Sequence, residues 1–343
     1  MEPKGGENHS VVAEFVLLGL SDSWSMQLLF IVLFSVFYVA TVLGNTLIML
    51  AVVADPRLHS PMYFLLANLS FIDFCAPFIA ATKMISDALK DTKVISFGGC
   101  FTQMFFIHFF GGSEMVLLVV MAYDRYVAIC RPLHYMATVT LPLCAWLVVA
   151  AWAIGLVHSV IQLVFVVDLP FCGPNEVDSF YCDFPRVIQL ACTDTYLLEF
   201  VVTANSGLIS MVIFLLLIFS YIFILVSVRQ RSSFGLSKAF STLSAHISVV
   251  VLLFGPCIFV YIWPFPNLAV DKYLAIFDAV IIPFLNPLIY TIRNKDMKVA
   301  MMKLTILLGR TGKSARASCS SRARGRQTPL THGGDKDPTW EPH

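Results

Sequence analysis

The sequence predicts an all-α membrane protein built as a bundle of seven transmembrane helices. Apolar residues of the AVILMFWYC set make up 58% of the 343 residues and charged residues only 13%, whereas soluble domains carry roughly 25% charged residues. The mean hydropathy is +0.79. Seven charge-poor runs are each long enough to cross a bilayer. The net charge of +1 shows no basic excess, so no nucleic-acid partner is expected.

The seven runs define the expected helices. A helix needs about 20 residues to cross a hydrocarbon core of roughly 30 Å, and its backbone groups must bond within the helix. The expected spans are 26–54, 61–82, 97–121, 139–166, 200–228, 239–263 and 273–292. Pro142, Pro256 and Pro283 are expected to kink or terminate helices, because proline lacks an amide donor.

The distribution of Lys and Arg predicts the orientation. These residues gather after the first, third, fifth and seventh spans, which places the amino terminus outside and the carboxy terminus inside. Asn8 begins an Asn-His-Ser triplet on the outer side and is the expected glycosylation site. The expected parts are an extracellular amino terminus (1–25), the bundle (26–293), an amphipathic interfacial helix (294–308) and a disordered basic tail (309–343) that lies against membrane lipid.

Four of the nine cysteines lie on the expected outer side, in an oxidising compartment. They are Cys100 at the top of the third span and Cys172, Cys182 and Cys192 in the long outer loop. Four thiols allow three connectivities. A Cys100–Cys182 bridge would fold the loop over the mouth of the bundle, and a Cys172–Cys192 bridge would then join the halves of the loop; we expect this pairing. A metal site is the alternative, but the loop lacks suitably spaced histidines.

Several sequence blocks occur in a fixed order along the chain. They are Gly44-Asn45, Leu58-His59-Ser60-Pro61-Met62-Tyr63-Phe64, Met121-Ala122-Tyr123-Asp124-Arg125-Tyr126-Val127-Ala128-Ile129-Cys130, Lys238-Ala239-Phe240-Ser241-Thr242 with His246, and Asn286-Pro287-Leu288-Ile289-Tyr290. With these blocks and the three-cysteine loop, the chain resembles an olfactory receptor, a branch of the rhodopsin-like G-protein-coupled receptors, from about Phe15 to Leu304. Leu243 and Ala245 depart from the Cys and Ser that are usual in the family.

The resemblance implies a function and its partners. The chain would bind a small volatile odorant in a rhodopsin-like bundle and activate a stimulatory, cAMP-raising heterotrimeric G protein. Its place would be the plasma membrane of the cilia of olfactory sensory neurons. No covalent chemistry is needed, so we expect no enzyme activity and no cofactor beyond a sodium ion in the bundle. The alternatives are a rhodopsin-like receptor for a non-odorant metabolite in another tissue, a transporter, or a non-signalling membrane protein.

Two carboxyl groups, Asp73 and Glu114, lie at mid-membrane positions. Burying an ionisable side chain there costs about 2.5–3.5 kcal/mol, which makes both residues functional candidates. Together with Asn45 and Asn286 they would line one polar cavity. The resemblance implies a sodium-ion or proton-linked site that collapses on activation. The alternative is a pair of protonated, hydrogen-bonded carboxyl groups that only support packing.

Arg125 follows Asp124 at the inner end of the third span. A guanidinium in this place can pair with Asp124 in the inactive receptor and contact a G protein once released. Tyr126 belongs to the same motif, and Tyr221 and Tyr290 would add hydroxyl groups to the same inner network. Alternatively, Arg125 is a positive-inside anchor and the tyrosines are interfacial rings.

The ligand pocket is expected beneath the disulfide-held loop. A small volatile ligand needs an apolar pocket with few polar anchors, and the resemblance implies that it lies between the third, fifth and sixth spans. The candidates are His108, Gly111, Gly112 and Met115 on the third span, Asn205 and Ser206 on the fifth, and Phe254, Cys257, Ile258 and Tyr261 on the sixth. The two glycines would make room beside His108. Each of these residues could instead belong to the packing core.

Overall fold

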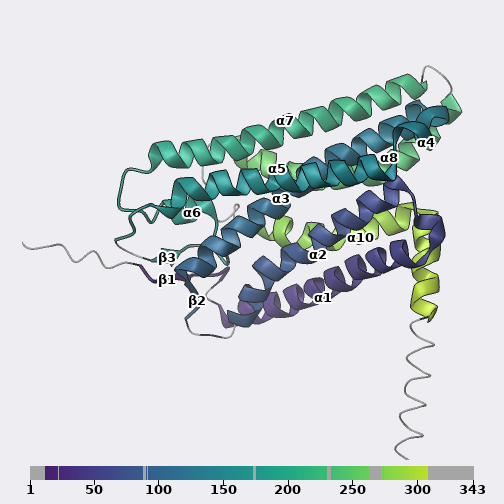
Figure 1. Ribbon diagram of the computed structural model, residues 1–343. Helices are drawn as coiled ribbons and strands as arrows, with labels where there is room; N and C mark the ends of the chain where they lie inside the picture. The colour runs from purple at the N-terminus through teal and green to yellow at the C-terminus, as the bar shows by residue number, and fades with distance from the viewer. Residues whose placement is uncertain are drawn as a thin grey trace, which may run out of the picture.

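The fold is an elongated bundle of helices that run side by side, as the computed structural model shows (Figure 1). The structure describes residues 12–21, 23–87, 90, 92–172, 175–229, 233–262, 272 and 274–307, without the side chains of 233–242, 245, 259–262, 278 and 292–293. Asn8, the tail 309–343 and the side chain of Tyr261 therefore lie outside this description.

Seven long helices build the bundle. They are α1 (Trp24–Ala54), α2 (Pro61–Asp87), α3 (Phe97–Cys130), α5 (Leu141–Val167), α7 (Tyr196–Arg229), α8 (Ser233–Ile262) and a last helix that passes through the π-helical turn Phe277–Ile281 into α10 (Ile282–Arg293). Within the described residues, six segments are long and apolar enough to cross a membrane, the last being Leu274–Thr291, and α8 adds the apolar stretch His246–Ile258. The predicted class, an all-α bundle of seven helices, is confirmed.

Helix ends differ from the ends of the charge-poor runs. α3 continues to Cys130 and not only to Met121, because no residue between them breaks a helix, although Asp124 and Arg125 are charged. The Ser96 hydroxyl accepts a hydrogen bond from the Gly99 amide at 3.1 Å and caps the start of this helix. Pro142 lies in the first turn of α5, where a missing amide donor costs little.

One end of the bundle, which we call the Arg125 end, carries the last turn of α3 and several short elements. They are the 3₁₀ turns Pro56–Leu58 and Pro132–His134 and the short helix α4 (Tyr135–Thr138). A further helix over 295–307 crosses this end (Figure 1). The side chain of Asn294 caps that helix by accepting from the Met297 amide at 3.1 Å. Met297 and Ala300 are buried and Lys295 and Lys298 exposed, so the helix is amphipathic.

The opposite end, which we call the loop end, carries a small sheet that was not expected from the sequence. Its strands are β1 (Glu14–Leu17), β2 (Val94–Ser96) and β3 (Glu176–Val177), in the order β2-β1-β3. β1 is antiparallel to β2, with Phe15 opposite Ile95, and parallel to β3. Phe15, Val177 and Phe184 of α6 (Phe184–Ile188) form a second hydrophobic core beneath it. The sheet therefore joins the amino-terminal segment to the loops that follow α2 and α5.

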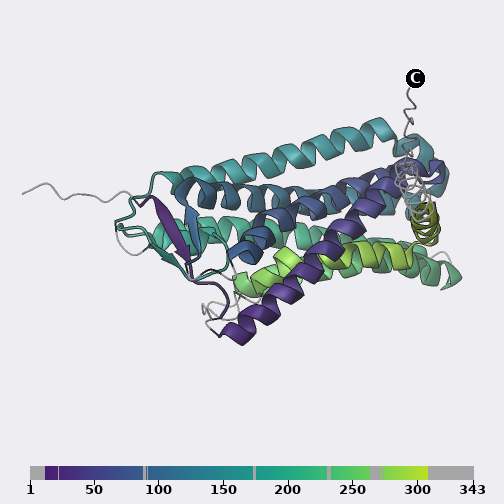
Figure 2. The same cartoon turned by 90° about the horizontal axis from the view of Figure 1, so that it is seen from below.

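Close contacts between small residues bring two pairs of helices together. A Cβ atom on Gly155 of α5 would lie 2.7 Å from the Phe109 carbonyl oxygen of α3, and one on Gly44 would lie 3.1 Å from Cβ of Pro287. Small residues let membrane helices approach closely. Figure 2 shows α1 crossing the last helix obliquely, and the rings of Phe37 and Phe284 pack 4.9 Å apart where the two helices meet.

Candidate functional site

The polar cluster predicted between the first, second, third and last helices is present in the core. The Asn286 amide donates hydrogen bonds to both carboxylate oxygens of Asp73, at 3.1 and 3.0 Å. Asn45 donates to the backbone oxygens of Thr41 and Pro283, each at 3.1 Å, and so joins α1 to α10. Asp73, Asn45 and Asn286 are at most 2% exposed, and Glu114 is 8% exposed.

This cluster offers oxygen atoms to a hard cation. The buried atoms Glu114 Oε1, Asn45 Oδ1 and Asn286 Oδ1 have no hydrogen-bond partner among the described residues. Hard cations prefer carboxylate and amide oxygens, so this donor set fits a sodium ion. No group of three or more His, Cys, Asp or Glu able to hold a metal occurs in the part of the chain that the structure describes. A cation here would therefore depend on two carboxyl groups and on amide oxygens.

Arg125 is held at the end of α3 by a chain of polar contacts. Its Nη2 atom lies 3.6 Å from Oδ2 of Asp124, whose other oxygen accepts a hydrogen bond from the Tyr135 hydroxyl at 2.7 Å. Burial and the adjacent Asp124 carboxylate raise the pKa of the Tyr135 phenol, so the hydroxyl stays protonated and keeps donating. The Tyr126 ring packs against Phe223 of α7 at 5.9 Å. Tyr135 was not among the predicted site residues.

A second polar contact joins α7 to α8. The Tyr221 hydroxyl and Nδ1 of His246 are 2.8 Å apart, and both side chains are buried. Tyr221 and Tyr290 both belong to the buried core of the bundle. The buried His246 Nε2 atom and Tyr290 hydroxyl have no hydrogen-bond partner among the described residues. In the sequence, His246 was noted only as part of a motif. Its contact with Tyr221 shows that it helps to hold α7 against α8.

The four cysteines that were expected on the outer side are joined as Cys100–Cys182 and Cys172–Cys192, which is the expected pairing. Cys100 and Cys182 are fully buried, and the side chain of Gln103 accepts a hydrogen bond from the Cys182 amide at 2.8 Å. The first bridge therefore fixes the long loop directly over the start of α3. Asp183 and Phe184, which follow Cys182, are positioned by it.

His108 contacts this fixed loop. Its Nε2 atom lies 3.9 Å from Oδ1 of Asp183, and its ring centroid lies 4.7 Å from that of Phe184 and 5.8 Å from that of His158. One turn further along α3, a Cβ atom on Gly111 would meet nothing within 4 Å. This open space beside His108 is consistent with the expected ligand level.

The other predicted ligand residues differ in how far they are buried and in which helices they contact. Gly112 does not make room in the bundle as expected: a Cβ atom there would lie 3.3 Å from Cα of Gly155, so Gly112 faces α5. Ser206 accepts a hydrogen bond from Gln162 of α5 at 2.8 Å, and Ser210 donates to the Met115 sulfur at 3.6 Å. Further residues are half-buried or core: Asn205, Cys257 and Ile258 are half-buried, and Phe254 is fully buried against Phe214.

Seven apolar helices, a loop bound by a disulfide to the third helix and an Asp-Arg pair at the far end of that helix define a rhodopsin-like G-protein-coupled receptor. The comparisons with known proteins agree: a family model described as olfactory receptor matches residues 34–308. The chain belongs to the olfactory receptor family. It is therefore a multi-pass membrane receptor that signals, and not an enzyme.

Individual relatives are similar over almost their whole length. Olfactory receptor 4F6 of Homo sapiens is 64% identical over 298 residues, which cover 86% of this chain and 95% of that receptor. Olfactory receptor 4F15 of Homo sapiens is 60% identical over 299 residues, covering 87% of this chain and 96% of the relative. Olfactory receptor 4K3 of Homo sapiens is 56% identical over 298 residues.

Proposed function

We propose that this odorant receptor binds a small volatile ligand between α3, α7 and α8 and activates a stimulatory, cAMP-raising G protein. The observation that carries the proposal is the contact chain Tyr135–Asp124–Arg125 at the end opposite the disulfide-held loop. A ligand that binds better to an arrangement in which Arg125 is released shifts the population toward that arrangement. His108, Gly111 and Met115 supply the ligand level on α3, and Arg125 supplies the contact with the G protein.

The polar cluster in the core takes part in the same change. In this proposal, Asp73, Glu114 and Asn286 hold a sodium ion or a proton in the resting receptor, supported by Asn45. Glu114 and Asn286 each have a buried oxygen atom without a hydrogen-bond partner among the described residues. This supports the role, because buried polar atoms need a partner. Loss of the cation on activation lets the helices that carry these residues move closer together.

The orientation follows the distribution of basic residues. The loop end faces outward with the disulfides in the oxidising compartment, and the Arg125 end faces the cytoplasm. Asn8 carries a glycan outside. The helix over 295–307 lies at the inner lipid surface, with the basic tail 309–343 beyond it. The site of action is the plasma membrane of olfactory cilia.

The test is cAMP production in cells that express the full chain with a stimulatory olfactory G protein, across a panel of volatile compounds. Arg125→Ala should abolish any odorant response at equal surface level. Arg131→Ala is the matched control, because Arg131 is an exposed arginine just past the end of α3. The control should respond like the original receptor. A response that survives Arg125→Ala, or that requires an inhibitory G protein, would contradict the proposal.

A further inference from the structure

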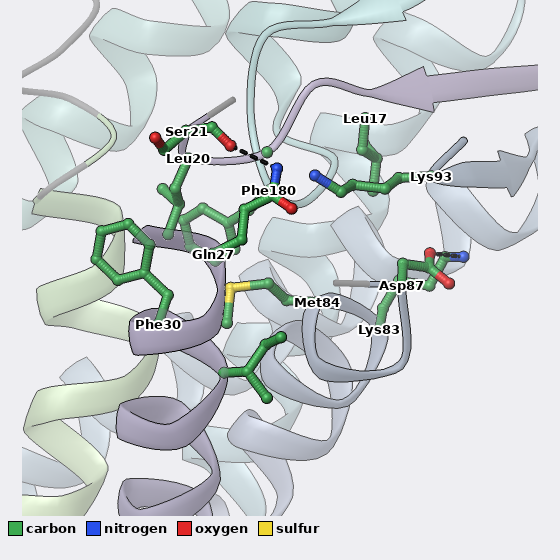
Figure 3. Close-up of a pocket in the computed structure, with 12 residues that line it drawn as sticks. Leu17, Leu20, Ser21, Gln27, Phe30, Lys83, Met84, Asp87, Lys93 and Phe180 are labelled. Carbon is green, nitrogen blue, oxygen red and sulfur yellow. Dashed lines mark hydrogen bonds and ion pairs between the residues drawn. The ribbon is translucent and has the colours of Figure 1, made fainter. Parts of the chain in front are cut away.

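A hollow that is partly open to solvent lies at the loop end, between α1, α2, the segment after β1 and the long loop (Figure 3). Among the residues that the structure describes, none of α3, α7 or α8 lines it. It is therefore separate from the level at which the odorant is proposed to bind.

The inner wall of the hollow is apolar. It is formed by Leu20, Phe30, Ile31, Met84 and Phe180. Figure 3 shows the Phe30 ring and the Met84 thioether at the α1 and α2 sides of the hollow. Phe180, from the long loop, is only 2% exposed and closes one side. This wall suits an aliphatic chain, because removing apolar surface from water is favourable.

The charges around the hollow leave one lysine without an acidic partner. Asp87 pairs with Lys83 and also with Lys90, at 2.8 Å, so its carboxylate is already satisfied twice. Lys83 donates in addition to the Val94 carbonyl at 2.6 Å. Lys93 forms no ion pair with any residue that the structure describes. Among the described residues, the lining therefore carries one positive charge that has no acidic partner.

Pairing with β1 fixes the backbone position of Lys93. Its carbonyl accepts a hydrogen bond from the Leu17 amide at 2.8 Å. Its ammonium lies over Gly19, where a Cβ atom would be only 3.0 Å away, and Gly19 has the positive φ of 78° that glycine alone adopts easily. Figure 3 shows the ammonium directed across the hollow toward the Gln27 amide, which is itself held by a 2.8 Å bond to the Ser21 carbonyl.

We propose that this hollow is a second ligand site that binds a short-chain aliphatic carboxylate, with its carboxylate group on Lys93 and its chain against Phe30, Ile31 and Met84. A carboxylate satisfies the free ammonium through a charge-assisted hydrogen bond. A neutral alcohol leaves that charge without a partner, and an amine is repelled by it. Because Lys93 is bonded to β1 and Met84 belongs to α2, the bound acid holds the amino-terminal segment against the bundle.

The test uses the full-length receptor, purified in nanodiscs of zwitterionic lipid. The probe is a photoreactive diazirine derivative of hexanoate, and the matched probe is the same derivative of 1-hexanol. Mass spectrometry should place the hexanoate label on peptides that contain Phe30, Ile31 or Met84. Excess sodium hexanoate should remove this label, and excess 1-hexanol should not.

Charge variants of the receptor complete the test. Lys93→Gln should reduce the label at least tenfold, and Lys93→Arg should restore it. Lys90→Gln is the matched control, because Lys90 lies in the same connection but does not line the hollow; its label should remain. The melting temperature of each variant shows that it is folded.

Three results would overturn the inference. The hexanoate label could fall only on α3, α7 and α8, which would make the acid a ligand of the odorant level alone. The label could be unchanged in Lys93→Gln or equal for the alcohol probe, which would remove the role of the charge. Phosphatidylserine in the nanodisc could displace the probe while hexanoate does not, which would make the occupant a lipid headgroup.

Discussion

At the loop end, disulfides and backbone hydrogen bonds hold the connecting segments to one another and to α3, whereas at the Arg125 end side-chain hydrogen bonds join the helices. Cys100–Cys182 attaches the long loop to α3, and Cys172–Cys192 closes that loop on itself. β1 pairs on both sides with strands from other segments. Any rearrangement of the loop end must break several of these contacts together.

The Arg125 end contains buried polar atoms that lack partners among the described residues. His246 Nε2 and the Tyr290 hydroxyl lie there, and Glu114 Oε1 lies deeper in the core. An unsatisfied buried polar group costs about 1–3 kcal/mol. This half of the bundle therefore has hydrogen bonds to gain from another arrangement. The loop end is therefore the fixed frame of the bundle, and we expect conformational change at the Arg125 end.

The largest effect is expected when the fixed frame loses its covalent bond. Cys100→Ser should lower the melting temperature of the purified receptor and its surface level strongly, because loss of a native disulfide typically costs about 2–5 kcal/mol. Cys75→Ser is the matched control, because Cys75 is a half-buried cysteine outside the disulfides. If both variants melt at the same temperature, the bridge does not hold the frame.

The frame should extend along α3 to its contact with α5. A methyl group added at Gly155 would lie 2.7 Å from the Phe109 carbonyl and 2.8 Å from the Ser113 amide nitrogen. Overpacking of this kind typically costs about 1–3 kcal/mol, so Gly155→Ala should lower the melting temperature. Gly111→Ala, where a methyl group meets nothing within 4 Å, should leave it almost unchanged. Equal effects would show that α3 and α5 separate easily.

At the Arg125 end, the loss of a single hydroxyl group should raise the basal activity of the receptor. Tyr135→Phe removes the 2.7 Å hydrogen bond to Asp124, and a hydrogen bond to a charged group contributes about 1.5–3 kcal/mol. Asp124 then holds Arg125 less firmly, and cAMP without odorant should rise, by up to about tenfold for a shift of 1.4 kcal/mol. Tyr123→Phe is the control, because Tyr123 is 41% exposed. Unchanged basal cAMP in Tyr135→Phe would show that this contact does not restrain the receptor.

The features that depend on composition could be predicted from the sequence, whereas the features that depend on packing could not. Charge-poor runs located the seven helices, and Asp73 and Asn286 were expected in one cluster because polar groups in a membrane seek each other. The strands were missed because β2 has three residues and β3 only two, too few for an alternating pattern. Gly112 was assigned to the wrong face, because helical spacing alone does not show which neighbour a helix presents to each side.

The smallest effect is expected for the ion pairs that cross the loop end. Asp178 accepts a hydrogen bond from Lys272 and lies 3.7 Å from Arg186, but its side chain is 41% exposed. Exposed ion pairs contribute about 0–1 kcal/mol and are screened by salt. Asp178→Asn should therefore lower the melting temperature slightly at low salt and hardly at all at high salt. A loss as large as that of Cys100→Ser, at both salt concentrations, would mean that charge and not the disulfide fixes the loop end.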